Sequence, residues 1–323
     1  MKRALVTGGH GFVPSHLAHA LLERGDTVTV VDSASPRWSG LALQGILAEV
    51  DLLEGDIRDA ELIGATMDAG AFDVVFHLAA RTLVGDAMDD PPGAFDVNVR
   101  GTWTVLEACR RNEVPAVIVA SSDKAYGPQD SLPYREDMAL RPASPYEASK
   151  AAADVIALSY RRSFGLPVAV TRFANIYGGG DVNFSRLIPE AVCALLDGRK
   201  PVIRSDGSPE RDLLYVDDAV AAYLAIEHAV GAGGPAAGEA LNAGWGEPHS
   251  VREVLELIAE VAGTEIEPDY QGLGSPDGEI DRQYVDATKL REVSGWDPKV
   301  ALRDGLAHTV AWYREHPEVR PDA

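Results

Sequence analysis

Two residues near the middle of the chain have the types and the spacing needed for a redox step on a hydroxyl group. Tyr146 and Lys150 stand in the stretch YEASK, and residues four apart share one face of a helix. A lysine ammonium beside a phenol favours the phenolate and lowers the phenol pKa. The pair is therefore predicted to take the proton from a sugar hydroxyl while hydride leaves the same carbon. The alternative is a tyrosine and a lysine that share a helix surface by chance.

A serine, an acid and a base follow one another in an earlier stretch, VASSDKAYG. Ser122 is a candidate hydrogen-bond donor to the reacting oxygen. Asp123 and Lys124 follow directly and supply an acid and a base. The stretch ends a predicted buried strand, which is where a doubly wound sheet places its ligands. The alternative is a solvated turn with an incidental ion pair.

The elements that must position these residues are short apolar strands that alternate with amphipathic helices. Helices are predicted near 14–24, 58–68, 95–112 and 146–164, and strands in the stretches RALVTGG, TVTVVD, VDLLEGD, FDVVFHLAA, PAVIVASSD and LPVAVTRF. This alternation indicates βαβ units and a parallel sheet that is covered on both faces. The predicted fold class is α/β, with a Rossmann-type doubly wound sheet.

The regular alternation of strands and helices ends near residue 177, and we place a domain boundary there. Residues 1–177 are predicted to form a dinucleotide-binding domain, which also uses parts of 213–245. Residues 178–323 are predicted to form a smaller α/β lobe that binds the substrate. This lobe is expected to close over the carboxyl ends of the strands.

The stretch LVTGGHGFVPSHL begins like a dinucleotide-binding turn between a strand and a helix. Gly8 and Gly11 have the expected spacing, but Pro14 stands where the pattern has a third glycine. Proline is tolerated in the first turn of a helix because its missing N–H has no partner there. Asp32 ends the next strand, where an acid binds a ribose and repels a 2′-phosphate. The turn therefore favours NAD over NADP, and the alternative is a plain turn that binds nothing.

Composition excludes several classes of partner. The chain has 323 residues and 46% hydrophobic residues, and its formal net charge is −21. Such an acidic chain is not expected to bind nucleic acid or an anionic membrane. Two cysteines without CxxC spacing predict no metal site and fit a reducing compartment. No signal peptide or membrane span is recognised, so a cytoplasmic protein is expected.

Seven motifs together resemble one family over nearly the whole chain. They are TGGHGFVPSHL, GDIRD, HLAA, SSDKAYG, YEASK, RFANIYG and RDLLYVDDAV, in the order and spacing of the extended short-chain dehydrogenase/reductases. The chain resembles the nucleotide-sugar epimerases and dehydratases of that family. Pro14 departs from its pattern.

The resemblance implies a set of residues that bind NAD. Gly8, Gly11, Phe12 and Val13 would hold the pyrophosphate, Asp32 the adenosine ribose, and Asp56 with Ile57 the adenine. Ala79, Ala80 and Asn98 would line the path of the cofactor, and Tyr146 and Lys150 would hold the nicotinamide ribose.

The resemblance also implies contacts to a nucleotide-diphosphate sugar and to a second subunit. Asn175, Arg211 and Arg282 would bind the sugar diphosphate, Thr82 would lie near the sugar, and Arg186 and Arg204 would add phosphate contacts. Guanidinium groups can hold a diphosphate even in an acidic protein. A homodimer is implied, with the helices near 95–112 and 146–164 at the interface.

The residues after Ser122 bear on which reaction follows oxidation at C4. An epimerase needs no acid there, whereas a 4,6-dehydratase must remove the C5 proton and expel the C6 hydroxyl. Asp123 is the expected acid and Lys124 the expected base, in a pattern that resembles the CDP-glucose 4,6-dehydratases. The first interpretation is a 4,6-dehydratase. The alternatives are a 4-epimerase, another 4-keto chemistry such as decarboxylation, and a non-catalytic NAD-binding sensor.

Overall fold

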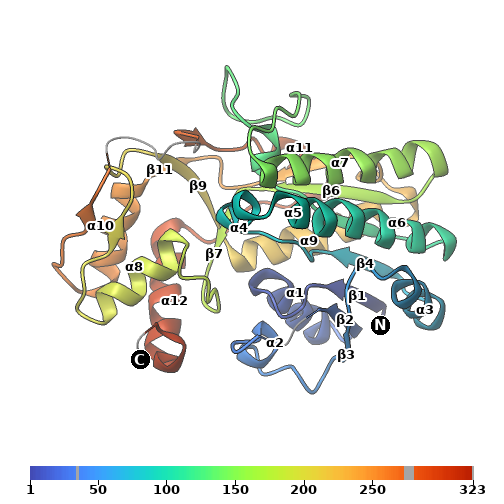
Figure 1. The fold of residues 1–323 in the computed structure, drawn as a ribbon, viewed down its shortest axis with the longest axis horizontal. Coiled ribbons are helices and arrows are strands. Elements are labelled where there is room, and N and C mark those ends of the chain that lie inside the picture. Colours follow the sequence, from blue (N-terminus) through green and yellow to red (C-terminus); the bar gives the residue numbers. More distant parts are fainter. Residues whose placement is uncertain (34–35, 273–279, 322–323) are drawn as a thin grey trace.

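A parallel sheet of seven strands forms the centre of the protein (Figure 1). The computed structural model describes residues 1–33, 36–272 and 280–321. All neighbouring strands of this sheet run parallel. From edge to edge the strands are β10 (Ala240–Ala243), β6 (Val168–Phe173), β5 (Val117–Ala120), β4 (Val74–His77), β1 (Arg3–Thr7), β2 (Thr27–Asp32) and β3 (Asp51–Glu54).

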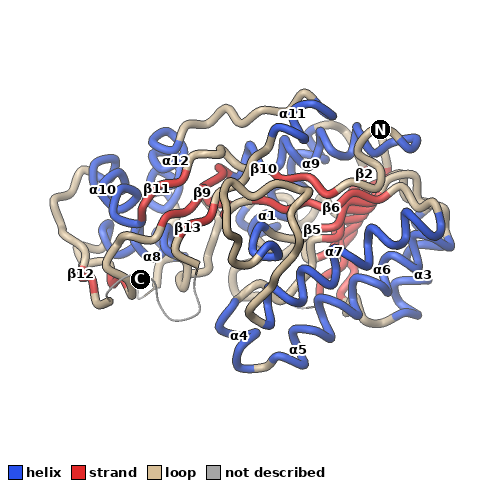
Figure 2. Tube along the Cα trace, turned by 90° about the horizontal axis from the view of Figure 1, so that it is seen from above, coloured by secondary structure: helices blue, strands red, loops and turns tan. Residues whose placement is uncertain are grey.

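Helices cover both faces of this sheet, because its central strands are apolar on both sides. Every residue of β4 and β6 is buried, as expected for strands inside a parallel sheet. Figure 2 shows the two helical layers on opposite sides of the strands. One layer holds α1 (Phe12–Glu23), α9 (Val216–Val230) and α11 (Thr288–Ser294), and the other holds α3 (Ala60–Gly70), α6 (Gly101–Arg111) and α7 (Pro145–Phe164). The predicted doubly wound α/β fold is confirmed.

Short helical segments connect these elements. Helix α2 (Gly40–Leu43) follows β2. Helices α4 (Val84–Asp89) and α5 (Pro91–Phe95) lead through a π-helical turn, η1 (Asp96–Arg100), directly into α6. A 3₁₀ turn, η2 (Asp123–Tyr126), follows β5.

A second, smaller group of elements lies at one end of the main sheet (Figure 1). Strands β11 (Pro248–Ser250), β9 (Glu210–Tyr215) and β13 (Arg282–Gln283) form one sheet, and β7 (Asn175–Tyr177) pairs with β9. Strand β8 (Val202–Ile203) pairs with β12 (Asp269–Tyr270). The helical segments here are α8 (Leu187–Leu196), α10 (Val251–Ala262), α12 (Leu302–Glu315) and η4 (Pro317–Val319).

The chain crosses between the two groups more than once. Strand β7 ends at residue 177 but belongs to the smaller sheet, because it pairs with β9. Helix α9, the 3₁₀ turn η3 (Gly231–Gly233) and β10 then bring the chain back to the main sheet, where β10 pairs with β6. A single cut at residue 177 therefore does not separate the two sheets.

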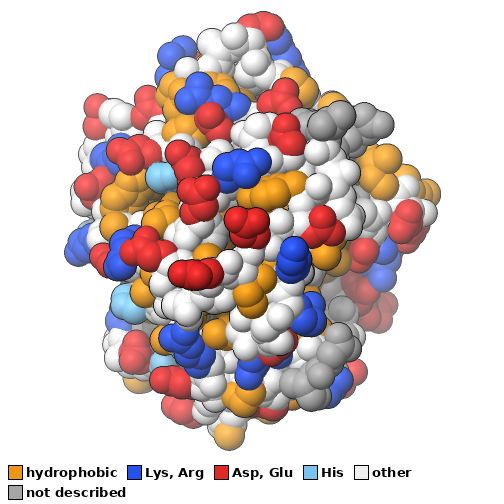
Figure 3. Space-filling view, turned by 90° about the vertical axis from the view of Figure 1, so that its left-hand side faces the viewer, with side chains coloured by type: hydrophobic (Ala, Val, Ile, Leu, Met, Phe, Trp, Pro, Cys, Tyr) orange, Lys and Arg blue, Asp and Glu red, His pale blue; other side chains and the backbone are white. Residues whose placement is uncertain are grey.

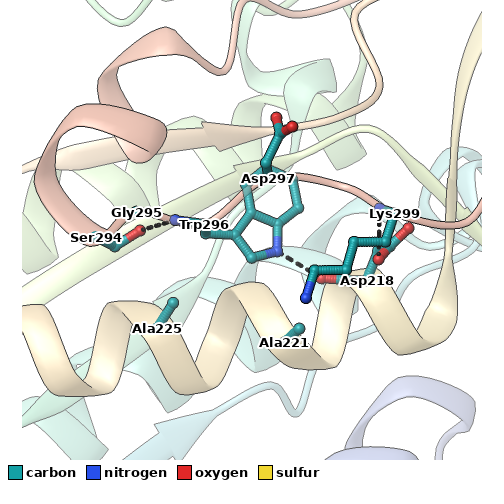
Figure 4. Close-up of a pocket in the computed structure, with 8 residues that line it drawn as sticks. All are labelled: Asp218, Ala221, Ala225, Ser294, Gly295, Trp296, Asp297 and Lys299. Atoms are coloured by element: carbon teal, nitrogen blue, oxygen red, sulfur yellow. Dashed lines mark hydrogen bonds between the residues drawn. The ribbon is translucent and has the colours of Figure 1, made fainter.

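Asp218 on α9 anchors the connection between α11 and α12. Its carboxylate accepts the N–H groups of Lys299 at 3.0 Å and Val300 at 2.9 Å, and its carbonyl accepts from the Trp296 indole at 3.0 Å (Figure 4). A cavity of about 240 Å³ beside these residues also borders Ala221 and Ala225. None of the predicted site residues lines it, and its contacts serve to attach the C-terminal helices.

Candidate functional site

The turn between β1 and α1 has the geometry of a phosphate cradle. Gly8 has φ +80°, and a Cβ on it would lie 2.8 Å from the Ala79 Cα; a Cβ on Gly11 would lie 3.1 Å from the Gly8 oxygen. Only glycine fits such a turn without strain. Gly11 precedes α1 and places no side-chain cap on it. The N–H groups of Phe12 and Val13 open the helix and have no partner within it, so they are available to an anion.

Pro14 does not disturb this turn. It is buried in the first turn of α1, and the first helical hydrogen bond runs from the Ser15 N–H to the Gly11 oxygen at 3.2 Å. The missing N–H of a proline at this position therefore leaves no hydrogen bond unmade. The Gly11 N–H donates to the Gly8 oxygen at 2.9 Å, so the Phe12 and Val13 N–H groups are the donors left for the predicted pyrophosphate contact.

The two acids predicted to hold adenosine lie at the ends of neighbouring strands. The Asp32 carboxylate accepts the N–H of His10 at 2.9 Å, and His10 in turn contacts the Ser39 hydroxyl at 2.6 Å. These contacts leave one Asp32 oxygen for a ribose hydroxyl. Arg58 binds Asp56 at 2.6 Å and lowers the pKa of that carboxyl. Ile57 beside it is buried in the core under the sheet.

The segment after β4 is held by an asparagine. Ala79 and Ala80 are half-buried there, and Thr82 is exposed. The buried Asn98 accepts the Arg81 N–H at 2.7 Å and donates to the Arg81 carbonyl at 3.0 Å. Its amide also donates to Ser149 on α7 at 2.8 Å. Asn98 therefore ties the segment to α7, and its polar atoms are engaged by protein groups.

Helix α7 positions Tyr146 and Lys150 because its start is fixed by a capping box. The Ser144 hydroxyl accepts the Glu147 N–H at 3.4 Å, and the Glu147 carboxylate accepts the Ser144 N–H at 3.2 Å. This reciprocal pairing sets where a helix begins. Tyr146 and Lys150 are 7% and 5% exposed, so both face the body of the protein.

Burial, rather than the lysine, dominates the titration of Tyr146. Burial first, and then the Asp123 charge, raise the pKa of this phenol to about 12, while hydrogen bonding from Ser122 and the Arg186 charge oppose them. Burial lowers the pKa of Lys150 to about 8. Lys150 Nζ donates to the Ala120 carbonyl at 2.9 Å, where β5 ends. The phenol pKa is thus raised overall, against the expected lowering by Lys150, whose ammonium donates to β5.

Ser122, Asp123 and Lys124 form a connected group at the end of β5. The Ser122 hydroxyl donates to Asp123 Oδ1 at 3.1 Å and accepts the Lys124 N–H at 3.2 Å. Lys124 Nζ lies 3.7 Å from Asp123 Oδ1. Asp123 is 1% exposed, and its Oδ2 makes no hydrogen bond within the described ranges. A buried carboxylate oxygen without a partner is costly, which marks this position as more than a solvated turn.

The predicted substrate residues differ in whether they contact Lys124 or Tyr146. Asn175 Oδ1 accepts from Lys124 Nζ at 2.9 Å, so Asn175 is connected to the group formed by Ser122, Asp123 and Lys124. Arg186 binds Asp181 at 2.8 Å, and its charge acts on the Tyr146 phenol. Arg204 follows β8 and is exposed.

Arg211 and Arg282 start from opposite faces of two paired strands. The register places Arg211 beside Gln283, and Arg282 beside Glu210, and successive residues of a strand point to opposite faces. Arg211 Nη1 donates to the Glu210 and Asp281 carbonyls at 2.9 and 3.2 Å. Arg282 contacts the Glu210 carboxylate at 2.5 Å. The two arginines therefore leave their strands on opposite faces, and their contacts to a diphosphate stay a prediction.

A cavity of about 440 Å³ borders the start of α7. Its wall joins the segment before α7, the helix itself and β13, through Pro128, Gln129, Leu132, Tyr134, Ala143, Glu147, Ile280, Asp281 and Arg282. Tyr134 is buried there and feels the charges of both Asp123 and Arg211. The cavity therefore lies between α7 and β13, and Arg282 lines it.

Sequence reasoning did not find Asp212, which organises the smaller sheet. Its carboxylate accepts the N–H groups of Trp245 at 3.0 Å, Gly246 at 3.1 Å and Val285 at 3.3 Å. Burial raises its pKa to about 6, and the Asp123 charge adds to this. The motif RDLLYVDDAV contains Asp212, but only the fold brings its three partners together.

On the face shown in Figure 3, acidic and basic side chains are interspersed. Among residues 1–33, 36–272 and 280–321, no helix is long and apolar enough to cross a membrane.

Known proteins match this chain over most of its length. Residues 4–244 match the sequence profile of the NAD dependent epimerase/dehydratase family. A UDP-glucose 4-epimerase of Mycolicibacterium smegmatis is 38% identical over 320 residues, covering 97% of this chain and 98% of that protein. A dTDP-glucose 4,6-dehydratase of Streptomyces griseus is 37% identical over 324 residues, covering 97% and 94%.

A solved structure matches equally broadly. The crystal structure of a dTDP-glucose 4,6-dehydratase from Bacillus anthracis, in complex with NAD, has a TM-score of 0.87, 30% identity and 98% coverage of both chains. The glycine cradle, the open N–H groups of α1 and the Asp32 carboxylate fit such a cofactor. The resemblance to extended short-chain dehydrogenase/reductases is thus confirmed, and NAD is the cofactor. The chain belongs to the NAD dependent epimerase/dehydratase family, whose relatives here act on nucleotide sugars, and it is an enzyme of that class.

Proposed function

We propose that the protein is an NAD-dependent nucleotide-sugar 4,6-dehydratase, which forms a 4-keto-6-deoxy sugar nucleotide. The observation that carries the proposal is the Asp123–Lys124 pair at 3.7 Å, beside Tyr146 at the end of β5. Oxidation and reduction at C4 alone need no second acid and base. A dehydratase needs both. When bound, NAD supplies the acceptor that takes hydride from C4 and later returns it to C6.

The chain's own residues would move the protons. Tyr146 would accept the proton of the C4 hydroxyl as a phenolate, so its pKa of about 12 must fall when substrate and cofactor bind; Ser122 is hydrogen-bonded to the phenol. The pair starts as an Asp123 carboxylate and a Lys124 ammonium, and transfer of one proton between them gives a carboxylic acid and an amine. The amine takes the C5 proton as the C5–C6 double bond forms. The acid protonates the departing C6 hydroxyl, so that water leaves.

This scheme returns every group to its starting protonation state, with solvent carrying one proton. After water leaves, Lys124 is again an ammonium and Asp123 a carboxylate, as at the start. When hydride reaches C6, C5 takes a proton back from Lys124. Lys124 then regains a proton from solvent, and Tyr146 releases to solvent the proton that it took from the C4 hydroxyl. Because a lysine ammonium exchanges its protons with water, the product should carry solvent hydrogen at C5.

A 4-epimerase is the second candidate. Two observations favour it: the Mycolicibacterium smegmatis relative at 38% identity is a UDP-glucose 4-epimerase, and Asp123 is 1% exposed. In that case Asp123 would hold Ser122 and Lys124 in place, and Lys124 would bind a sugar hydroxyl.

Mass spectrometry in heavy water tests the proposal. The enzyme with NAD is offered CDP-, dTDP-, UDP- and GDP-hexoses in turn. A product lighter by one water, with deuterium at C5, is expected, and the accepted donor identifies the nucleotide. A product of unchanged composition, inverted at C4 and without deuterium, would make the protein an epimerase.

We further propose how the remaining parts serve this reaction. The seven-stranded sheet with its helices would hold NAD, and the smaller sheet with α8, α10 and α12 would hold the nucleotide. Trp103 on α6 is 45% exposed, and Val155 and Phe164 on α7 are 60% and 59% exposed. These apolar side chains support a homodimer through α6 and α7, because exposed apolar side chains on packed helices fit a partner surface.

A further inference from the structure

A single asparagine links the proposed base to the smaller sheet. Lys124 follows β5 of the main sheet, whereas Asn175 opens β7, which pairs with β9. Lys124 Nζ donates to Asn175 Oδ1 at 2.9 Å, and Asn175 Nδ2 donates to the Asp212 carbonyl on β9 at 3.5 Å. Asn175 is thus the described side chain that joins the Lys124 amine to the strand carrying Arg211.

The contacts of the Lys124 amine decide where its lone pair can point. A lysine side chain has four rotatable bonds and a compact charge, so its position depends on its partners. Here the partners are the Asp123 carboxylate at 3.7 Å and the Asn175 carbonyl oxygen at 2.9 Å. An amide oxygen accepts without being able to take the proton, so Asn175 orients the nitrogen while the proton passes to Asp123.

We propose that Asn175 is a positioning residue for Lys124, and that it acts on the loss of water through that lysine. The inference rests on the proposed function, because it assigns Lys124 the C5 proton. It adds to the expectation that Asn175 binds the diphosphate, because that binding would use the Nδ2 donor, whereas Lys124 contacts the Oδ1 acceptor. Substrate held by the smaller sheet would then set the base through β9, Asp212 and Asn175.

A double-mutant cycle on water loss tests this assignment. Asn175→Ala, Lys124→Ala and the double variant are compared with the wild type, each loaded with NAD. Three quantities are measured: nicotinamide reduction in a single turnover, deuterium entry at C5, and KM. A displacement of about 1 Å can slow a reaction by about 100-fold, so Asn175→Ala should slow deuterium entry roughly 10- to 100-fold. Nicotinamide reduction at saturating substrate should change less than about threefold.

The double variant distinguishes a positioning role from a binding role. If Asn175 acts through Lys124, adding Asn175→Ala to Lys124→Ala should slow water loss less than about twofold, since coupled residues are not additive. Additive losses, or a rise in KM that accounts for the whole effect, would overturn the inference. Asn175→Ser replaces Asn175→Ala if the latter does not bind NAD, with the same expectation.

Failure of the proposed function gives a different pattern. In that case the wild type itself releases no water and takes up no deuterium. If the wild type does release water and the losses of the two single variants add up in the double variant, the dehydratase proposal is supported and the positioning role of Asn175 is wrong.

Discussion

The buried lysine of the candidate site should reduce the stability of the protein while it serves the reaction. Lys150 is 5% exposed, and burial lowers its pKa from 10.5 to about 8. At pH 7 the folded protein therefore carries a buried ammonium that the unfolded chain exposes to water. We predict that Lys150→Met makes the nucleotide-free protein more stable and abolishes turnover.

The expected gain follows from the pKa. The change from 10.5 to about 8 corresponds to about 3 kcal/mol at 1.36 kcal/mol per pKa unit. The variant also removes the hydrogen bond from Lys150 Nζ to the Ala120 carbonyl, which costs about 1 kcal/mol. The net gain at pH 7 is therefore about 2 kcal/mol.

The difference in unfolding free energy between the variant and the wild type should depend on pH. Between pH 8 and 10.5 the unfolded chain binds more protons at Lys150 than the folded protein does. Stability of the wild type therefore rises with pH in that window relative to the variant. The gain from Lys150→Met should be complete below pH 8 and shrink steadily as the pH approaches 10.5.

Urea unfolding of both proteins between pH 6 and 10 measures this difference. Lys200→Met is the matched control, because Lys200 is exposed; its effect should stay within about 0.5 kcal/mol. A Lys150→Met protein that is less stable than the wild type at pH 7, with a pH-independent difference, would refute the reasoning.

Three further outcomes are expected. Asp123→Asn removes the proposed acid and should slow water loss about 10²- to 10⁴-fold; undiminished water loss would contradict this. Because the Asp123 charge raises the pKa of Tyr146, nicotinamide reduction by this variant should also reach half its maximum at a lower pH. Gly8→Ala should weaken NAD binding roughly tenfold in a fluorescence titration, through about 1–2 kcal/mol of strain in the turn. Gly25→Ala is the control: its φ is also positive, at +87°, but nothing lies within 4 Å of the added Cβ, so NAD binding should not change. Trp103→Glu should turn a dimer into a monomer by light scattering, and an unchanged mass would argue against the α6–α7 interface.

Much of the NAD-binding half was predictable, because local pattern and chain order fix it. Apolar strands alternating with amphipathic helices can only bury their faces in a covered parallel sheet. The helix predicted at 146–164 is observed as Pro145–Phe164, since Ser144 and Glu147 cap its start within the sequence itself. The tolerance of Pro14 was also predictable, because it depends on helix position alone.

The smaller sheet was not predictable in the same way. Its strands are two to six residues long, and strands so short carry little periodicity. That β7 leaves the main sheet to pair with β9 depends on contacts between segments far apart in the chain. That Arg211 and Arg282 leave paired strands on opposite faces follows from the register of β13 on β9, which the motifs do not contain.

The sequence by itself determined which chemistry is present: Tyr146 with Lys150 on one helix face, an acid and a base after Ser122, and a glycine turn before a helix. Residue types and short spacings suffice for this, because helix and turn geometry are local. Only the tertiary structure decided how these groups behave. Burial sets the pKa of Tyr146 at about 12 and that of Lys150 at about 8. Asn175 reaches Lys124 because two sheets meet there, and desolvation and long-range contact exist only once the chain has folded.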